Sequence, residues 1–279
     1  SLVFFITGCS TPVSSEKKLV NFQSHIHGIA VDVEEPAWLY IATHKGLYLL
    51  AENKLTLLGN SRDDYMGFSI HPKDSQVFYS SGHPQTGGNL GVMKSEDGGN
   101  TWKKISTGGI GQSVDFHAMT ISSANPLILY GWHGGNVFRS DDGGSSWKNF
   151  SDQILITSFA SHPSNENIVF AGTRGAMLKS SDKGKTWINI FDLSVPEDIV
   201  QDIKIDAENG NIWIATNEEG IMKSSFTEGA FDFKSVGSLP ENASPRQLAL
   251  HPKNPNTIFA HDTDKIYRSA DWGQSWGVL

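Results

Sequence analysis

The chain has 279 residues, of which 38% are hydrophobic and 28 are glycines, a composition typical of a folded protein rich in turns. Its formal charge is −8, and it contains no run of lysines or arginines, which argues against nucleic acid as a partner. Length alone is compatible with one large all-β domain or with two ordinary domains, so internal repeats have to decide between them.

The chain begins with an apolar stretch that ends at Cys9, the only cysteine, and a polar segment with several serines follows. Eight apolar residues are too few to span a bilayer. Ile6-Thr-Gly-Cys9 resembles the lipobox of a bacterial lipoprotein signal peptide, so we expect residues 1–9 to be the remnant of such a signal, with lipidation on Cys9. Residues 10–22 then form a tether and a closing strand. The alternative is a buried strand with Cys9 as a core thiol.

This interpretation implies an exported protein, anchored to a membrane through the lipid on Cys9 and located at the cell surface or facing the periplasm.

Four segments share the pattern Ser-x-Asp-x-Gly-x-Ser/Thr-Trp, and they begin at Ser95, Ser140, Ser180 and Ser269. The last interval is about twice as long as the first two, which predicts a degenerate copy in the gap, after Ile221-Met-Lys-Ser224. In each segment the Asp can accept backbone N–H groups of a tight bend, the Gly supplies a positive φ, and the Trp can pack between repeats. We therefore assign structural roles to Asp97, Trp102, Asp142, Trp147, Asp182, Trp187, Asp271 and Trp276.

The same order of four short strands recurs six times along the chain. The copies begin at Gly28–Val33, Gly67–His71, Phe116–Ser122, Leu155–His162, Gln201–Asp206 and Gln247–His251. Six copies predict an all-β fold, a six-bladed β-propeller of four-stranded antiparallel blades over residues 23–279. The repeated turns would join the third and fourth strands of a blade, and Leu19–Phe22 would pair with Ser275–Leu279 to close blade 6.

Alternating strand direction separates two ends of such a propeller. His71, His162 and His251 recur at one repeat position beside the repeated turns, so we interpret them as structural. The other end collects histidines and carboxylates where first strands begin and second strands end. The ligand or metal candidates there are His25, His27, His83, Asp115, His117 and His133.

Converging imidazoles with a nearby carboxylate would suit a transition-metal ion, and Asp115 could orient one of the rings. The alternative is that these histidines are hydrogen-bonded structural groups. No cofactor is established by the sequence.

The repeated turns, together with His25-Ile-His-Gly28, Ser81-Gly-His-Pro84 and Asp115-Phe-His-Ala-Met119, resemble bacterial Asp-box (BNR-repeat) β-propeller lipoproteins that are labelled glycosyl-hydrolase-like. These belong to the superfamily of sialidase- and sortilin-type propellers. From the histidine-rich face we expect a binding or assembly module that uses this face to engage a ligand, a metal ion, a partner protein or a glycan.

The same resemblance leaves an alternative open, a sialidase-like glycosidase that acts on extracellular glycans. Its candidate residues are Arg62, Asp64, Tyr65, Arg174 and Arg246. The sequence has no Arg-Ile-Pro signature before the first blade, and a propeller fold by itself is weak evidence for hydrolysis.

Overall fold

A computed structural model describes residues 24–150, 153–225 and 231–279. The expectations for the lipidated Cys9, for the tether and for the closing strand Leu19–Phe22 fall outside the described residues. Most of the degenerate turn that follows Ser225 falls outside them as well.

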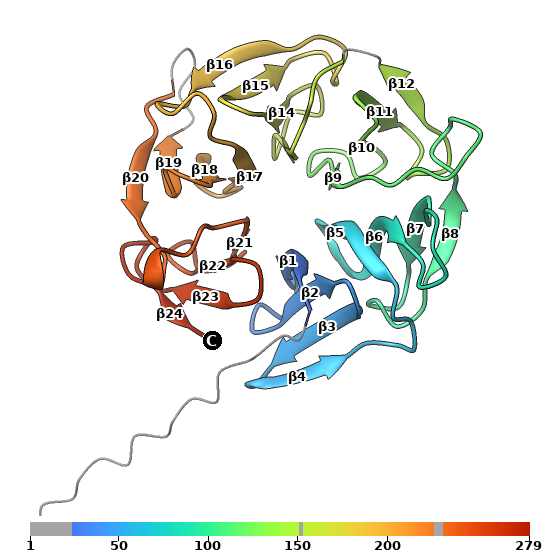
Figure 1. The fold of residues 1–279 in the computed structure, drawn as a ribbon, viewed down its shortest axis with the longest axis horizontal. Helices are drawn as coiled ribbons and strands as arrows, with labels where there is room; N and C mark the ends of the chain where they lie inside the picture. The colour runs from blue at the N-terminus through green and yellow to red at the C-terminus, as the bar shows by residue number, and fades with distance from the viewer. Residues whose placement is uncertain (1–23, 151–152, 226–230) are drawn as a thin grey trace, which may run out of the picture.

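Six four-stranded antiparallel sheets surround a common axis, which confirms the predicted six-bladed β-propeller (Figure 1). Blades 1 and 2 contain β1 (Ile26–Val31), β2 (Leu39–Thr43), β3 (Gly46–Ala51), β4 (Lys54–Leu57), β5 (Asp64–His71), β6 (Asp74–His83), β7 (Val92–Ser95) and β8 (Lys103–Ser106). Blades 3 and 4 contain β9 (Ala118–Ile121), β10 (Leu129–His133), β11 (Asn136–Ser140), β12 (Lys148–Phe150), β13 (Ser158–Ser161), β14 (Val169–Gly172), β15 (Ala176–Ser180) and β16 (Ile188–Asp192). Blades 5 and 6 contain β17 (Val200–Ile205), β18 (Asn211–Thr216), β19 (Ile221–Ser225), β20 (Lys234–Gly237), β21 (Gln247–Leu250), β22 (Ile258–His261), β23 (Ile266–Ser269) and β24 (Gly277–Val278).

Burial follows the position of a strand within its blade. All five residues of β2 are buried, because neighbouring blades cover both faces of an inner strand, whereas the outermost strand β4 exposes Lys54 and Thr56. The described residues contain one short helical segment, the 3₁₀ turn Pro240–Asn242, and no helix among them has the length and apolar character needed to cross a membrane.

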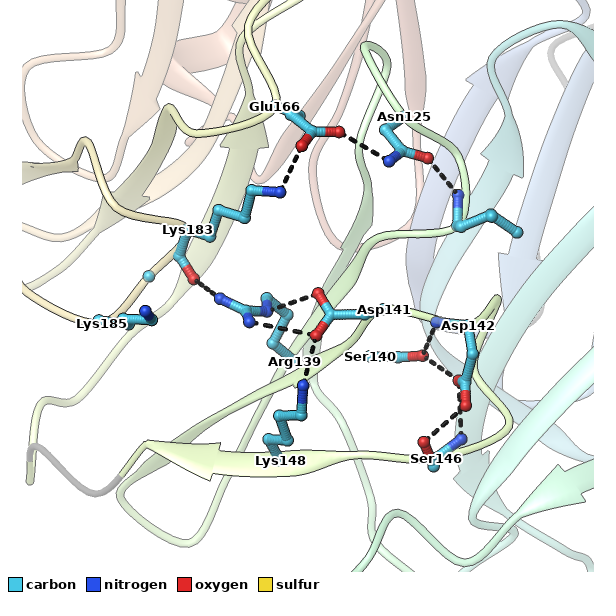
Figure 2. Close-up of polar contacts among 12 residues, drawn as sticks. Asn125, Arg139, Ser140, Asp141, Asp142, Ser146, Lys148, Glu166, Lys183 and Lys185 are labelled. Carbon is cyan, nitrogen blue, oxygen red and sulfur yellow. Dashed lines mark hydrogen bonds and ion pairs between the residues drawn. The ribbon is translucent and has the colours of Figure 1, made fainter.

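The repeated turns are built around their Asp and Ser side chains, as Figure 2 shows for blade 3. Asp142 accepts hydrogen bonds from the backbone N–H of Ser146 (2.8 Å), from the Ser140 hydroxyl (2.8 Å) and from the Ser146 hydroxyl (2.5 Å). The Ser140 hydroxyl also accepts the N–H of Gly144 (2.8 Å). The turns at Asp97, Asp182 and Asp271 have matching contacts, so this local network fixes the bend between the last two strands of four blades.

Neighbouring blades are joined by apolar contacts and by a polar network near the repeated turns. Trp147 is buried with Tyr79 of blade 2 and Phe116 of blade 3. In Figure 2, Arg139 of blade 3 donates to the backbone carbonyl of Lys183 in blade 4 (2.7 Å), and Lys183 pairs with Glu166.

The ring closes where blade 1 meets blade 6. Ile26 donates its N–H to the carbonyl of Thr263 (3.1 Å), and Ile26 and Ile29 pack with Ala249 and Ile266. Blade 6 takes all four of its described strands from the C-terminal part of the chain. Among the described residues, side-chain packing and this backbone contact therefore join the two ends of the ring.

Candidate functional site

Two clusters of histidine and aspartate side chains lie at the end of the axis where the first strands begin. The first cluster consists of His27, His44 and Asp64, and the second cluster consists of His83, Asp115 and His117. Within each cluster, one potential ligand atom from each residue lies within 4.8 Å of the other two. Because these are nitrogen and carboxylate atoms, each cluster has the donor set of a transition-metal site.

Both clusters bridge two successive blades in the same way. His44 lies in the turn after β2 and Asp64 begins β5, so the first cluster joins blades 1 and 2. His83 ends β6, and Asp115 precedes β9, so the second cluster joins blades 2 and 3. The propeller thus repeats one arrangement, in which the end of a second strand meets the entry to the next blade.

The first cluster contains two buried polar atoms without hydrogen-bond partners. His44 Nδ1 lies 2.7 Å from Oδ2 of Asp64, whereas His27 Nε2 lies 3.5 Å from Oδ1 of the same carboxylate. Both His27 Nε2 and Asp64 Oδ1 are inaccessible to solvent, and neither forms a hydrogen bond. The His27 and His44 rings are nearly perpendicular, with centroids 4.1 Å apart. A buried acceptor that lacks a partner is costly, so this geometry favours an additional group between the two blades.

Burial lowers the pKa of His27 to about 4, although the nearby Asp64 carboxylate opposes the shift. His27 is therefore neutral at pH 7. A neutral imidazole keeps one nitrogen lone pair, which is the form that coordinates metal ions.

On average, the histidines of the second cluster are more exposed to solvent than those of the first. The side chain of Asp115 is 9% exposed, and its Oδ2 lies 3.1 Å from Nε2 of His83 and 2.5 Å from Nε2 of His117. The hydrogen bond to Asp115 raises the pKa of His117. The other carboxylate oxygen, Oδ1 of Asp115, is buried without a hydrogen-bond partner.

The ring orientation of His83 is set by the backbone. Its Nδ1 lies 2.9 Å from the carbonyl oxygen of Gly88, which can only accept, so Nδ1 carries the hydrogen. In the neutral ring Nε2 is then a bare acceptor that faces the Asp115 carboxylate. A proton on Nε2 or a bound metal ion would turn this pair of acceptors into an attractive contact.

The remaining histidines of the sequence prediction lie beside these clusters. The ring of His25 lies 5.4 Å from that of His44, at the margin of the first cluster. His133 Nδ1 contacts the backbone of Asp115 (2.9 Å to its carbonyl oxygen), so it braces the segment that carries the second cluster. Of the six residues predicted as ligands, the structure groups three in the second cluster and places His27 in the first.

The partnership of His44 with Asp64 is absent from the predicted ligand set. His44 is not selected as a ligand in the sequence analysis, and Asp64 is assigned there to the glycosidase alternative. The available signal was positional, because His44 directly follows β2 and His83 ends β6, so both lie at the end of a second strand.

Among the described residues, the residues of the glycosidase alternative make separate contacts. Tyr65 is 1% exposed and stacks on Trp102, with ring centroids 4.8 Å apart, and burial raises its pKa to about 12. Arg62 donates to the carbonyl of Ser61 (2.8 Å). Arg174 forms an exposed ion pair with Glu197. Arg246 directly precedes β21 of blade 6 and donates its backbone N–H to the carbonyl of His261 (2.8 Å). In the part of the chain that the structure describes, no contact joins the three arginines.

No family model matches the chain, and no curated protein matches it. Solved structures do resemble it. A GH74 xyloglucanase from Xanthomonas campestris superposes with a TM-score of 0.66 at 16% identity over 92% of this chain, which spans 45% of the length of the xyloglucanase. YCF48 from Cyanidioschyzon merolae gives a TM-score of 0.55 at 15% identity, over 94% of this chain and 87% of its own. At such low identity these similarities establish the propeller fold alone.

Proposed function

We propose that this protein is a binding module whose histidine-rich end holds divalent transition-metal ions, one in each cluster. The observation that carries the proposal is that each cluster gathers two imidazoles and one carboxylate, and that one oxygen of each carboxylate, Oδ1 of Asp64 or Oδ1 of Asp115, is buried without a hydrogen-bond partner. His27 Nε2 faces Asp64 Oδ1 at 3.5 Å, and His83 Nε2 faces Asp115 Oδ2 at 3.1 Å. A bound cation would interact favourably with the imidazole nitrogens and the carboxylate of each cluster.

Two imidazoles and one carboxylate suit zinc, copper or cobalt better than calcium or magnesium, which prefer oxygen ligands. The hydrogen bond from His83 Nδ1 to the Gly88 carbonyl is the kind of outer contact that fixes the tautomer of a metal-binding histidine. Three protein ligands leave a coordination position on zinc open. A group from a ligand or from a partner protein can occupy that position, which suits a binding or assembly module.

The solved neighbours include GH74 enzymes and a protein bound to a peptide, so the shared fold does not decide between a binding role and a hydrolytic role. One neighbour is a YCF48 structure bound to D1 peptide, with a TM-score of 0.57 at 13% identity, and others are GH74 enzymes. The buried Tyr65 and the dispersed arginines give the sialidase-like alternative less support.

The proposal also includes the cellular location inferred from the sequence. The segment around Cys9 and the repeated turns are the basis for an exported, lipid-anchored protein similar to bacterial Asp-box lipoproteins. An anchored module would present its metal-bearing end to ligands outside the cytoplasm.

Metal uptake tests the proposal directly. The metal-free protein is equilibrated with zinc, passed through a desalting column and analysed by elemental mass spectrometry. We expect two zinc ions per chain in the wild type and one in each of His44→Ala and His83→Ala. His162→Ala, on the opposite end, is the matched control and should retain two. A wild type that retains no zinc, or cluster variants that retain two, would contradict the proposal.

A further inference from the structure

A cavity of about 340 Å³ lies on the axis at the end opposite to the two clusters. It is lined by the later halves of the innermost strands of five blades and by the turns that follow them. Its apolar lining includes Ile29, Phe68, Ile121, Ile205 and Leu250, from β1, β5, β9, β17 and β21. The volume is within the range of about 300–1,000 Å³ that is usual for small-molecule sites.

Lys204 carries the only permanent positive charge among the described residues that line this cavity. Its Nζ lies 2.9 and 3.0 Å from the two carboxylate oxygens of Asp202, whose side chain is 5% exposed. Asp202 also accepts the N–H of Leu248 (2.8 Å). An ammonium group has three N–H donors, so the pair with Asp202 leaves at least one donor for a further acceptor.

The other buried charged group of the lining, Asp206, has both of its carboxylate oxygens occupied by hydrogen bonds. The Asp206 carboxylate accepts hydrogen bonds from its own turn, from the N–H of Glu208 (2.9 Å) and from the side-chain amide of Asn209 (2.5 Å). Glu208 is exposed at the rim. Since Lys204 already pairs with Asp202, and both oxygens of Asp206 already accept hydrogen bonds, a charged ligand would lose its hydration without gaining an unpaired counter-ion.

We propose that this axial cavity binds a small, uncharged, mainly apolar molecule that presents a carbonyl or hydroxyl oxygen to Lys204. The apolar body of the molecule packs against Ile29, Phe68 and Leu250, and the oxygen accepts a hydrogen bond from the ammonium group. This site is separate from the metal clusters, because it opens at the other end of the axis.

Benzophenone is a suitable probe, because it is uncharged, has a single carbonyl acceptor and inserts into nearby C–H bonds under ultraviolet light. We expect saturable labelling of the wild-type protein, with the adducts mapped by peptide mass spectrometry to residues that line the cavity. Labelling that does not saturate, or adducts confined to the outer surface, would overturn the proposal. This measurement needs no variant, so it holds even where substitutions disturb folding.

Variants then test the site and the role of Lys204. Ala30→Leu fills the cavity from β1 and should lower benzophenone affinity at least about tenfold, whereas Ala51→Leu, in the outer part of the same blade, should leave it unchanged. The double variant with Lys204→Met and Asp202→Asn removes the ion pair without leaving a buried charge. It should abolish the preference of the wild type for benzophenone over diphenylmethane, which lacks the carbonyl. A folded Ala30→Leu variant with unchanged affinity for benzophenone would refute the proposed site. A preference for benzophenone over diphenylmethane that survives in the double variant would refute the role of Lys204.

Discussion

His27 Nε2 faces Oδ1 of Asp64 across 3.5 Å between blades 1 and 2, and neither atom has a hydrogen-bond partner. The two residues are brought together from different blades, so a group that binds both of them also ties the blades together. This relationship links the proposed metal site to the stability of the whole ring.

Zinc should therefore stabilise the folded protein. At a free zinc concentration of 100 times the dissociation constant, one site contributes about 2.7 kcal/mol to the free energy of unfolding. Asp64→Asn should lose the contribution of the first cluster and keep that of the second. Thermal unfolding with and without zinc measures this, with magnesium as the control ion. Equal stabilisation of the variant and the wild type would exclude the first cluster as a site.

Stability should fall between pH 6.5 and pH 4 because of His261. This residue is 1% exposed, and burial lowers its pKa from 6.5 to about 4, so its neutral form stabilises the fold above pH 6.5. That contribution is lost as the pH falls towards 4, because the unfolded chain binds the proton first, and it amounts to about 3 kcal/mol. In urea unfolding across this range, His261→Gln should show a shallower pH dependence, whereas His162→Gln, at a less buried site, should change it less. An unchanged slope in His261→Gln would contradict this account.

The stability that the repeated turns provide should be lost at a lower pH than the contribution of His261. Hydrogen bonds from Thr186 and Ser180 hold the pKa of Asp182 at about 2, against burial, which raises it. The stability that these bonds provide is present above pH 3.8 and is lost as the pH falls towards 2. Asp182→Asn should lower the free energy of unfolding by about 1–2 kcal/mol at pH 7, with the difference from wild type shrinking below pH 3.

The control for this experiment is Asp232→Asn. The side chain of Asp232 is 81% exposed and pairs only with Lys234 among the described residues, so the substitution should have little effect. Equal losses in the two variants would mean that the hydrogen bonds of the turn contribute nothing specific.

Gly67→Ala should disturb the contact between blades 2 and 3. Gly67 has a φ of +53°, and a Cβ there would lie 2.3 Å from the carbonyl oxygen of Phe116, which is next to both Asp115 and His117. We expect a loss of about 3 kcal/mol or more in the free energy of unfolding, together with weaker zinc binding at the second cluster. Gly87→Ala has a similar φ of +84° but open space around the new Cβ, so its loss should be near 1 kcal/mol. Urea unfolding of the two variants would separate steric contact from backbone strain.

Lipidation can be tested on the chain expressed with a complete export signal in a bacterial host. The protein should enter the membrane fraction and incorporate labelled fatty acid, and Cys9→Ser should abolish both. Ser14→Ala, in the proposed tether, should abolish neither. Labelling that persists in Cys9→Ser would place the lipid elsewhere or exclude it.

The sequence by itself determined the number of blades and the position of their turns. A turn such as Ser140–Trp147 holds most of its hydrogen bonds within eight residues, and strand periodicity is also local, so both leave a readable pattern. The sequence also placed the histidine-rich segments at one end of the axis, because strand direction alternates within every blade.

Only the tertiary structure decided which of those side chains meet. Asp64 pairs with His44, and Asp115 with His83, because the entry to one blade lies against the end of a second strand in the blade before it. The same packing buries Tyr65 under Trp102 and removes it from the surface. Contacts of this kind depend on how adjacent blades are rotated and spaced around the ring, and that geometry is set by side chains distant in the chain, which no local pattern encodes.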